Sequence, residues 1–215
     1  MKVALIGATG FVGSHILKEL LTRKHEVTAI ARNTDKIDIV DDKLTVASVN
    51  VIDTDILTDV LKGNTIVISA FNAGWDNPNI YEDYLNGYES IQKAIRAANI
   101  RRFFVVGNSG TLYEGGKQLV EADDFPAEMG QGAKASRDHF EKLRRETYLD
   151  WVYLAPPTDL NKEINTGRTG KFRIGRDEPI IREGVASISL EDLAMVVVDE
   201  VENRNNSRQQ FTVGY

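Results

Sequence analysis

The chain has 215 residues, a length that suits a substantial core, and we expect residues 1–215 to form a single domain. It has no cysteine, which excludes disulfides and cysteine-bound metals, and its net charge of -6 argues against a nucleic acid partner, because nucleic-acid affinity depends on clustered Lys and Arg. The sequence has neither an apolar run long enough to cross a bilayer nor a basic and then apolar signal region, so the expected location is cytoplasmic, without a membrane partner.

Short apolar runs rich in β-branched residues alternate with segments of helical periodicity, a pattern typical of βαβ units around a parallel sheet. Continuous apolarity indicates strands that are buried on both faces. The predicted strands are residues 2–6, 26–31, 44–49, 65–69, 102–106 and 151–155. The clearest predicted helices are residues 81–98, 132–146 and 190–202, and the segment 189–192 before the last of them reads as a capping box. The fold class is therefore α/β, a Rossmann-like doubly wound parallel sheet with a small C-terminal region that covers the substrate.

Two segments interrupt this alternation. Residues 111–131 and 157–187 are rich in glycine, proline and charge. Loops of this length in a compact domain are usually functional or disordered. We therefore expect both segments to lie on the substrate side.

The sequence GATGFVG lies between the first predicted strand and an amphipathic helix. In a βαβ unit, three glycines at such spacing allow a tight turn, the approach of backbone N–H groups to a pyrophosphate, and close helix packing. The positive end of the following helix then points at the phosphates. The pattern predicts a dinucleotide site rather than a simple strand-to-helix turn, with contacts from Gly7, Thr9, Gly10, Phe11, Val12 and Gly13.

The end of the second strand selects the dinucleotide, because an acidic residue there would bind both hydroxyls of the adenosine ribose. Here the strand ends in Ala31-Arg32-Asn33, without an acid. An arginine can pair with the 2′-phosphate, which a carboxylate would repel. Arg32 therefore favours NADP(H) as the cofactor, and NAD(H) is the alternative. The competing interpretation of Arg32 is a solvated surface charge.

Together with GATGFVG, the segments 31–33, 50–53, 150–157 and 211–215 resemble the atypical short-chain dehydrogenase/reductase superfamily, in particular its NADH-flavin reductase branch. The resemblance covers nearly the whole chain. It implies that residues after the third strand flank the adenine, that residues after the fourth line the cofactor, and that a serine after the fifth faces the nicotinamide. The corresponding positions are Asn50, Val51 and Asp53, then Ala70 and Phe71, then Ser109 as the catalytic candidate, with Pro156 of the double proline as a further cofactor contact.

Classical members of this superfamily use Tyr-x-x-x-Lys on a helix as a proton shuttle. The pattern occurs as Tyr113-Glu114-Gly115-Gly116-Lys117, but two adjacent glycines oppose the helical turn that would bring Tyr and Lys together. The predicted helix 132–146 has no tyrosine four positions before a lysine. We therefore expect no such pair, a deficit that hydride transfer to a flavin or quinone tolerates, because the acceptor itself stabilises the incoming charge.

Other side chains have supporting roles in this interpretation. Ser109 would orient the carboxamide or the acceptor, and Trp75 and Phe71 could stack on a flat substrate. His139 is expected to be a surface or packing residue rather than a base, and Trp151 to pack in the core. No spacing of histidines and carboxylates indicates a metal.

The leading hypothesis is an NAD(P)H-dependent reductase of a planar acceptor, such as free flavin or a quinone, with flavin as substrate rather than tightly bound cofactor. A non-catalytic NADP(H)-sensing regulator is the main alternative. A nucleotide-sugar epimerase or dehydratase fits less well because it needs the Tyr and Lys pair. The sequence is compatible with an oligomer.

Overall fold

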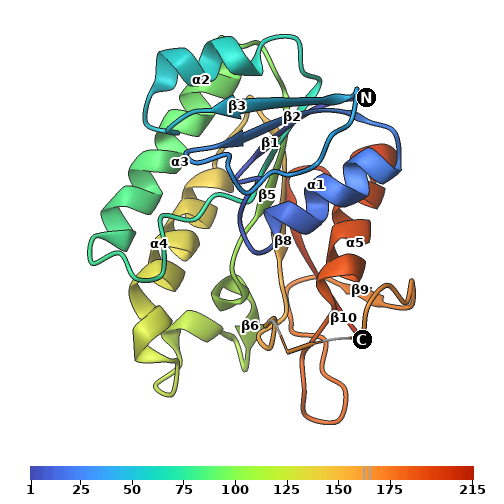
Figure 1. Ribbon diagram of the computed structural model, residues 1–215. Coiled ribbons are helices and arrows are strands. Elements are labelled where there is room, and N and C mark those ends of the chain that lie inside the picture. Colours follow the sequence, from blue (N-terminus) through green and yellow to red (C-terminus); the bar gives the residue numbers. More distant parts are fainter. Residues whose placement is uncertain (162, 165) are drawn as a thin grey trace.

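The computed structural model describes residues 1–161, 163–164 and 166–215, so Lys162 and Asn165 of the predicted 157–187 segment lie outside the described residues. Its main feature is an eight-stranded sheet in the order β3-β2-β1-β4-β5-β8-β10-β9, in which only the pairing of β9 with β10 is antiparallel within the described chain (Figure 1). In this order the strands are β3 (Leu44–Ser48), β2 (Glu26–Ala31), β1 (Lys2–Ile6), β4 (Ile66–Ser69), β5 (Arg102–Val106), β8 (Asp150–Ala155), β10 (Gln209–Gly214) and β9 (Arg173–Gly175). All six predicted strands are confirmed, with small differences at their ends.

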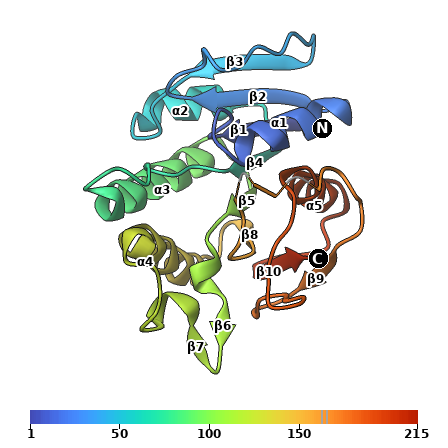
Figure 2. The same ribbon diagram turned by 60° about the horizontal axis from the view of Figure 1, so that its bottom comes forward.

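Helices cover both faces of the sheet, which confirms the predicted doubly wound α/β class (Figure 2). The helices α1 (Gly13–Thr22) and α5 (Leu190–Asn203) lie on one face, and α2 (Thr54–Leu61), α3 (Ile80–Ala97) and α4 (Ala127–Leu143) lie on the other. Each face of the sheet has its own hydrophobic core, and alternate residues of β1 belong to different cores. Val3 and Leu5 pack in the core with α1 and α5, and Ala4 and Ile6 pack in the core with α2, α3 and α4. No helix of the described chain is long and apolar enough to cross a membrane.

The segment before α5 is fastened to that helix. Ser189 Oγ accepts a hydrogen bond from the Asp192 backbone N–H at 3.1 Å, as the predicted cap requires. The Asp192 carboxylate does not complete a capping box, because it accepts instead from the backbone N–H groups of Thr169 and Gly170, both at 2.9 Å, and from the Tyr215 hydroxyl at 2.8 Å. Part of the predicted C-terminal covering region is thus tied to the end of the chain.

The predicted 111–131 segment contains more regular structure than its composition indicated. It includes a small hairpin, β6 (Tyr113–Glu114) and β7 (Lys117–Gln118), and the start of α4, which begins before the predicted residue 132. Gly132 lies inside α4, where a Cβ would come within 2.6 Å of the Trp75 ring. Packing against Trp75 therefore outweighs the low helix propensity of this glycine.

His139 lies in the core between α4 and α3, which confirms its predicted packing role. Its ring stacks on Tyr88 with centroids 3.9 Å apart, and neither ring nitrogen has a hydrogen-bond partner in the described chain. Burial, with a smaller contribution from Lys142, lowers the pKa of His139 to about 3. The residue is therefore neutral at physiological pH.

This shift predicts a pH-dependent stability. Below the pKa of about 6.5 that His139 has in the unfolded chain, the unfolded chain binds a proton that the folded protein does not bind. The contribution of neutral His139 to the free energy of unfolding is therefore complete above that pH and is lost as the pH falls toward 3. In this range the free energy of unfolding falls by about 1.4 kcal/mol for each pH unit. We expect the wild type to lose about 2 kcal/mol more than His139→Phe between pH 7 and pH 5 in urea unfolding. A difference between the two proteins that does not vary with pH would contradict this.

Candidate nucleotide-binding site

A cavity of about 480 Å³ opens at the carboxyl ends of the central strands. Its walls include Gly7 after β1, Arg32 after β2, Ala70 after β4, Gly107 after β5 and Pro156 after β8. The chain proceeds outward from β1 through β2 and from β4 through β5, so the cavity lies at the point where the strand order reverses. Open α/β sheets bind ligands at this position.

The glycine turn forms the cavity wall beside β1, and its three glycines differ in how much space each would leave for a side chain. Gly7 has φ of +80°, and a Cβ there would lie 2.5 Å from the Ala70 carbonyl oxygen. A Cβ at Gly13 would lie 2.1 Å from the Gly7 carbonyl oxygen, so the start of α1 packs closely on the turn. At Gly10 the nearest atom to a Cβ is the Gly7 carbonyl oxygen at 3.2 Å, and Gly10 lines the cavity. Gly7 and Gly13 are thus required by the fold, whereas Gly10 leaves room in the cavity.

The N-terminus of α1 is suited to an anion. The first turn of the helix has no acidic residue, and the N-cap position, Val12, has no side chain that could accept from the helix N–H groups. Among the described residues, no acceptor is bound to the backbone N–H groups of Phe11 and Val12, which both line the cavity. Free N–H groups at the positive end of a helix bind phosphates, so the turn fits a dinucleotide pyrophosphate.

The residues predicted for the adenosine end divide into two groups. Arg32 is exposed and lines the cavity, and Val51 lines it as well. Asn50 and Asp53 are not among the residues that line it: Asn50 Oδ1 accepts from Ile52 N at 3.5 Å, and Asp53 N donates to the Asn50 carbonyl at 3.0 Å. These two residues form the turn between β3 and α2. Gly13 is likewise behind the cavity wall rather than on it.

The other end of the cavity is aromatic. Ala70, Phe71, Ser109 and Pro156 line the cavity, as does Trp75, a residue that remains 47% exposed. Trp151, by contrast, is 3% exposed and packs edge to face with Phe140, as expected for a core residue. The structure therefore brings the residues that the resemblance assigned to the cofactor and to the nicotinamide into the same cavity as the aromatic residues considered for stacking.

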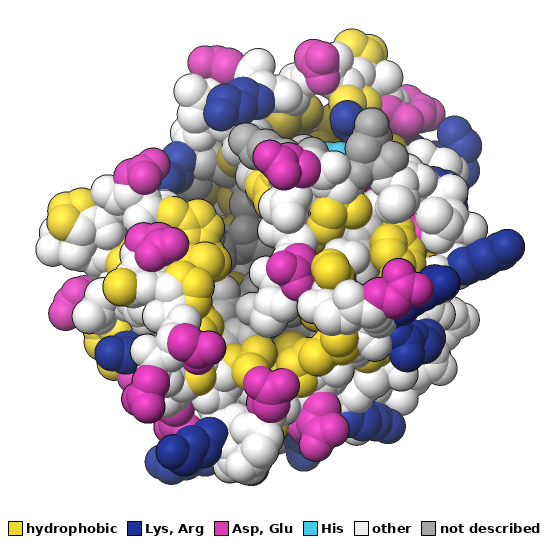
Figure 3. All heavy atoms as spheres, turned by 90° about the horizontal axis from the view of Figure 1, so that it is seen from below, with side chains coloured by type: hydrophobic (Ala, Val, Ile, Leu, Met, Phe, Trp, Pro, Cys, Tyr) yellow, Lys and Arg dark blue, Asp and Glu magenta, His cyan; other side chains and the backbone are white. Residues whose placement is uncertain are grey.

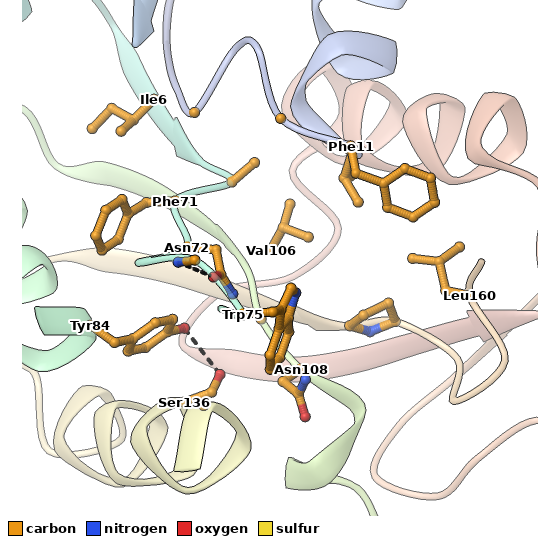
Figure 4. Close-up of a pocket in the computed structure, with 18 of the residues that line it drawn as sticks. Ile6, Phe11, Phe71, Asn72, Trp75, Tyr84, Val106, Asn108, Ser136 and Leu160 are labelled. Atoms are coloured by element: carbon orange, nitrogen blue, oxygen red, sulfur yellow. Dashed lines mark hydrogen bonds between the residues drawn. The ribbon is translucent and has the colours of Figure 1, made fainter. Parts of the chain in front are cut away.

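Sequence reasoning missed the polar side chains that two helices bring to this end. Tyr84 of α3 and Ser136 of α4 line the cavity, and their side-chain oxygens are 3.0 Å apart (Figure 4). Asn72 and Asn108 lie close by, beyond the ends of β4 and β5. The signal that could have found Tyr84 is the helical spacing of Tyr81, Tyr84 and Tyr88, which places aromatic hydroxyls on the inner side of α3.

The Tyr113 to Lys117 match is not helical. Tyr113 pairs with Gln118 and Glu114 with Lys117 across the hairpin, while Gly115 and Gly116 have φ of +57° and +84° at its tip. Tyr113 does not line the 480 Å³ cavity but contributes to a separate depression beside Phe140 and Trp151. The geometry agrees with the expectation that this motif is not a Tyr and Lys pair.

Under the reductase hypothesis, Tyr113→Phe should therefore leave NADPH-dependent reduction within a few-fold of the wild-type rate, as measured in steady state. The substitution removes a hydroxyl outside the cavity. A loss on the order of a thousandfold, the scale expected when a proton-transfer group is removed, would restore Tyr113 as the catalytic tyrosine.

Comparison with known proteins indicates that the chain binds a nicotinamide nucleotide. Residues 7–204 match the model of a family described as NAD(P)H-binding. The chain is 30% identical to the uncharacterized protein YwnB of Bacillus subtilis, with 99% of this chain and 98% of that protein covered. It is similar to the solved structure of a putative epimerase from Bacteroides thetaiotaomicron, with a TM-score of 0.91, 37% identity, and 100% and 96% of the two chains covered. It is also similar to a putative NADH-flavin reductase from Streptococcus pneumoniae, with a TM-score of 0.86, 30% identity, and 100% and 99% covered.

Proposed function

Because the chain belongs to the NAD(P)H-binding family of Rossmann proteins, we propose that it is a reductase that passes a hydride from NADPH to a planar acceptor such as free flavin or a quinone. The observation on which this rests is the division of one cavity into two unlike ends. The glycine turn and Arg32 offer anion-binding groups, whereas the opposite end offers Phe71 and Trp75. A dinucleotide placed with its phosphates at the turn would extend its nicotinamide toward the aromatic end.

We assign the cofactor contacts to those residues that were predicted from the sequence to bind the cofactor and that line the cavity. Ser109 would orient the carboxamide or the acceptor. The choice of NADPH over NADH rests on Arg32, which adjoins the end of β2. When bound, the cofactor supplies the hydride, and the protein positions the two rings against each other. Flavin is a substrate in this scheme.

The two loop segments are proposed to cover the acceptor. Met129, at the end of the 111–131 segment, lines the cavity, as do Pro157, Thr158 and Leu160 of the 157–187 segment. Side chains from both segments thus meet over the same opening, within what we take to be one domain.

An epimerase or dehydratase reaction is less well supported. Removing a hydride and a proton from a sugar alcohol requires a base with a suitable pKa, usually a Tyr that a Lys activates. The cavity-lining residues of the described chain include no lysine, and burial raises the pKa of the cavity tyrosine, Tyr84, well above its usual value. Tyr84 is therefore a poor base.

A panel of NADPH and NADH, each with FMN, FAD, riboflavin and simple quinones, tests the proposal. We expect acceptor-dependent oxidation of the cofactor that saturates with acceptor, and faster with NADPH than with NADH. A protein that binds NADPH but accelerates none of these reactions would be a cofactor sensor rather than a reductase.

A further inference from the structure

The acceptor end of the cavity has no charged side chain among the described residues. Arg32 is the one charged residue that lines the whole cavity, and it follows β2, whereas the acceptor end lies beyond β4 and β5. Three strand spacings separate β2 from β5, which is about 14 Å. Among the residues that the structure describes, no lining cation therefore lies beside the place of an acceptor's own phosphate group.

The surface around the opening adds negative charge. Exposed acidic residues adjoin lining residues in the sequence: Asp76 follows Trp75, Glu128 precedes Met129, and Asp159 follows Thr158. Figure 3 shows hydrophobic side chains around the hollow on this face and acidic side chains on both sides of it. Like charges repel, so this rim disfavours an anionic acceptor.

A directional chain of hydrogen bonds ends at the same place. The backbone N–H of Asn108, which can only donate, donates to the Tyr153 hydroxyl oxygen at 3.1 Å. Tyr153 can then donate to Ser136 Oγ at 2.8 Å, and Ser136 to the Tyr84 hydroxyl oxygen at 3.0 Å. This order leaves the Tyr84 hydrogen for the neighbouring Tyr88 hydroxyl or for a group in the cavity, which Tyr84 and Ser136 both line (Figure 4).

The surroundings of Tyr84 favour a hydroxyl that donates a hydrogen bond but stays protonated. It is 3% exposed, and burial, followed by the neighbouring tyrosines, raises its pKa well above the usual value. The chain behind it ends at a backbone N–H, which cannot resupply a proton. A transferred proton must therefore reach the product from water, and Tyr84 acts by stabilising negative charge.

Resting on the reductase function proposed above, we propose that the acceptor is an uncharged planar carbonyl compound whose oxygen accepts a hydrogen bond from Tyr84. The class comprises quinones and flavins without a phosphate. The hydride brings two electrons to the acceptor, and negative charge develops on the carbonyl oxygen beside the Tyr84 hydroxyl. One proton from water completes the neutral reduced acceptor, and NADP⁺ remains.

Matched pairs that differ only in charge test the acceptor class. Riboflavin should exceed FMN, and menadione should exceed a sulfonated naphthoquinone, by about tenfold or more in kcat/KM with NADPH. Equal or better use of the charged members would overturn this inference while leaving the reductase function intact. If no acceptor is reduced at all, both proposals fail.

Binding gives a readout that is independent of turnover. With NADP⁺ present, the fluorescence of riboflavin should be quenched on binding beside Trp75, and its dissociation constant should be at least about tenfold lower than that of FMN. Equal affinity for the two flavins would contradict an uncharged acceptor site.

Tyr84→Phe tests the hydroxyl, with Tyr88→Phe as the matched control. Tyr88 is also a buried tyrosine of α3 and adjoins Tyr84, but its hydroxyl accepts from Ser69 Oγ and donates to the Phe71 carbonyl, and Tyr88 does not line the cavity. We expect Tyr84→Phe to lower kcat for menadione by about 10- to 100-fold, since a hydrogen bond to developing charge is lost, and Tyr88→Phe to stay within a few-fold. Riboflavin affinity in the presence of NADP⁺ should fall only for Tyr84→Phe. An equal effect of the two substitutions, or none from Tyr84→Phe, would remove Tyr84 from the reaction.

Discussion

Gly10→Val is expected to abolish NADPH binding in a chain that still folds. A Cβ at Gly10 has one neighbour, the Gly7 carbonyl oxygen at 3.2 Å, and the remaining side-chain atoms would occupy the cavity where the turn approaches the pyrophosphate. Calorimetry with NADPH measures the loss, and circular dichroism with a melting curve measures the fold.

Valine substitutions at two other glycines serve as controls for Gly10→Val. Gly130→Val adds the same side chain to α4 where a Cβ meets nothing within 4 Å, and it should retain NADPH affinity. Gly13→Val should fail to fold, because its Cβ would lie 2.1 Å from the Gly7 carbonyl oxygen. Unchanged NADPH affinity in well-folded Gly10→Val would remove the pyrophosphate from this turn.

Arg32→Ala is expected to weaken NADPH binding by about one to two orders of magnitude and to leave NADH nearly unchanged. A charge-assisted contact with the 2′-phosphate contributes roughly 1.5 to 3 kcal/mol, and NADH lacks this phosphate. Arg32→Asp should go further, since a carboxylate repels the phosphate and accepts from the ribose hydroxyls of NADH. The measurement is the ratio of the two dissociation constants at one ionic strength, because salt screens exposed charges.

Lys36→Ala provides the control for the general charge of this region. Lys36 is an exposed cation four residues after Arg32 and is not among the cavity-lining residues. Its loss should leave the ratio of the NADPH and NADH dissociation constants as in the wild type. A wild type that prefers NADH, or a ratio that is the same in wild type, Arg32→Ala and Arg32→Asp, would make Arg32 a surface charge.

The central strands could be predicted because each is apolar on both faces, a pattern that depends on local sequence alone. β10 could not be predicted in the same way, because it begins with Gln209 and Gln210 and contains Thr212. Distant partners satisfy some of its polar groups: Gln210 Nε2 donates to Asp177 at 3.0 Å, and the Thr212 hydroxyl donates to the Ala155 carbonyl at 2.7 Å. Tertiary contacts thus decide whether these residues can form a buried strand.

The candidate site likewise contains residues that could be predicted from the sequence and residues that could not. Gly10, Arg32 and Ala70 follow strands, and the meeting of parallel strand ends at one edge made their proximity predictable. Tyr84 and Ser136 are 52 residues apart and meet because α3 and α4 pack side by side. Helical periodicity identifies the buried side of each helix but does not give the register of one helix against its neighbour.

The most direct test of catalysis is a single turnover without oxygen, in which the protein is mixed with one equivalent each of NADPH and menadione while the absorbance of both is followed. The proposed reductase should oxidise one NADPH for each menadione reduced, much faster than the mixture without protein, and Gly10→Val should not accelerate the reaction. NADPH that binds at this turn but is oxidised no faster than in solution would contradict a reductase.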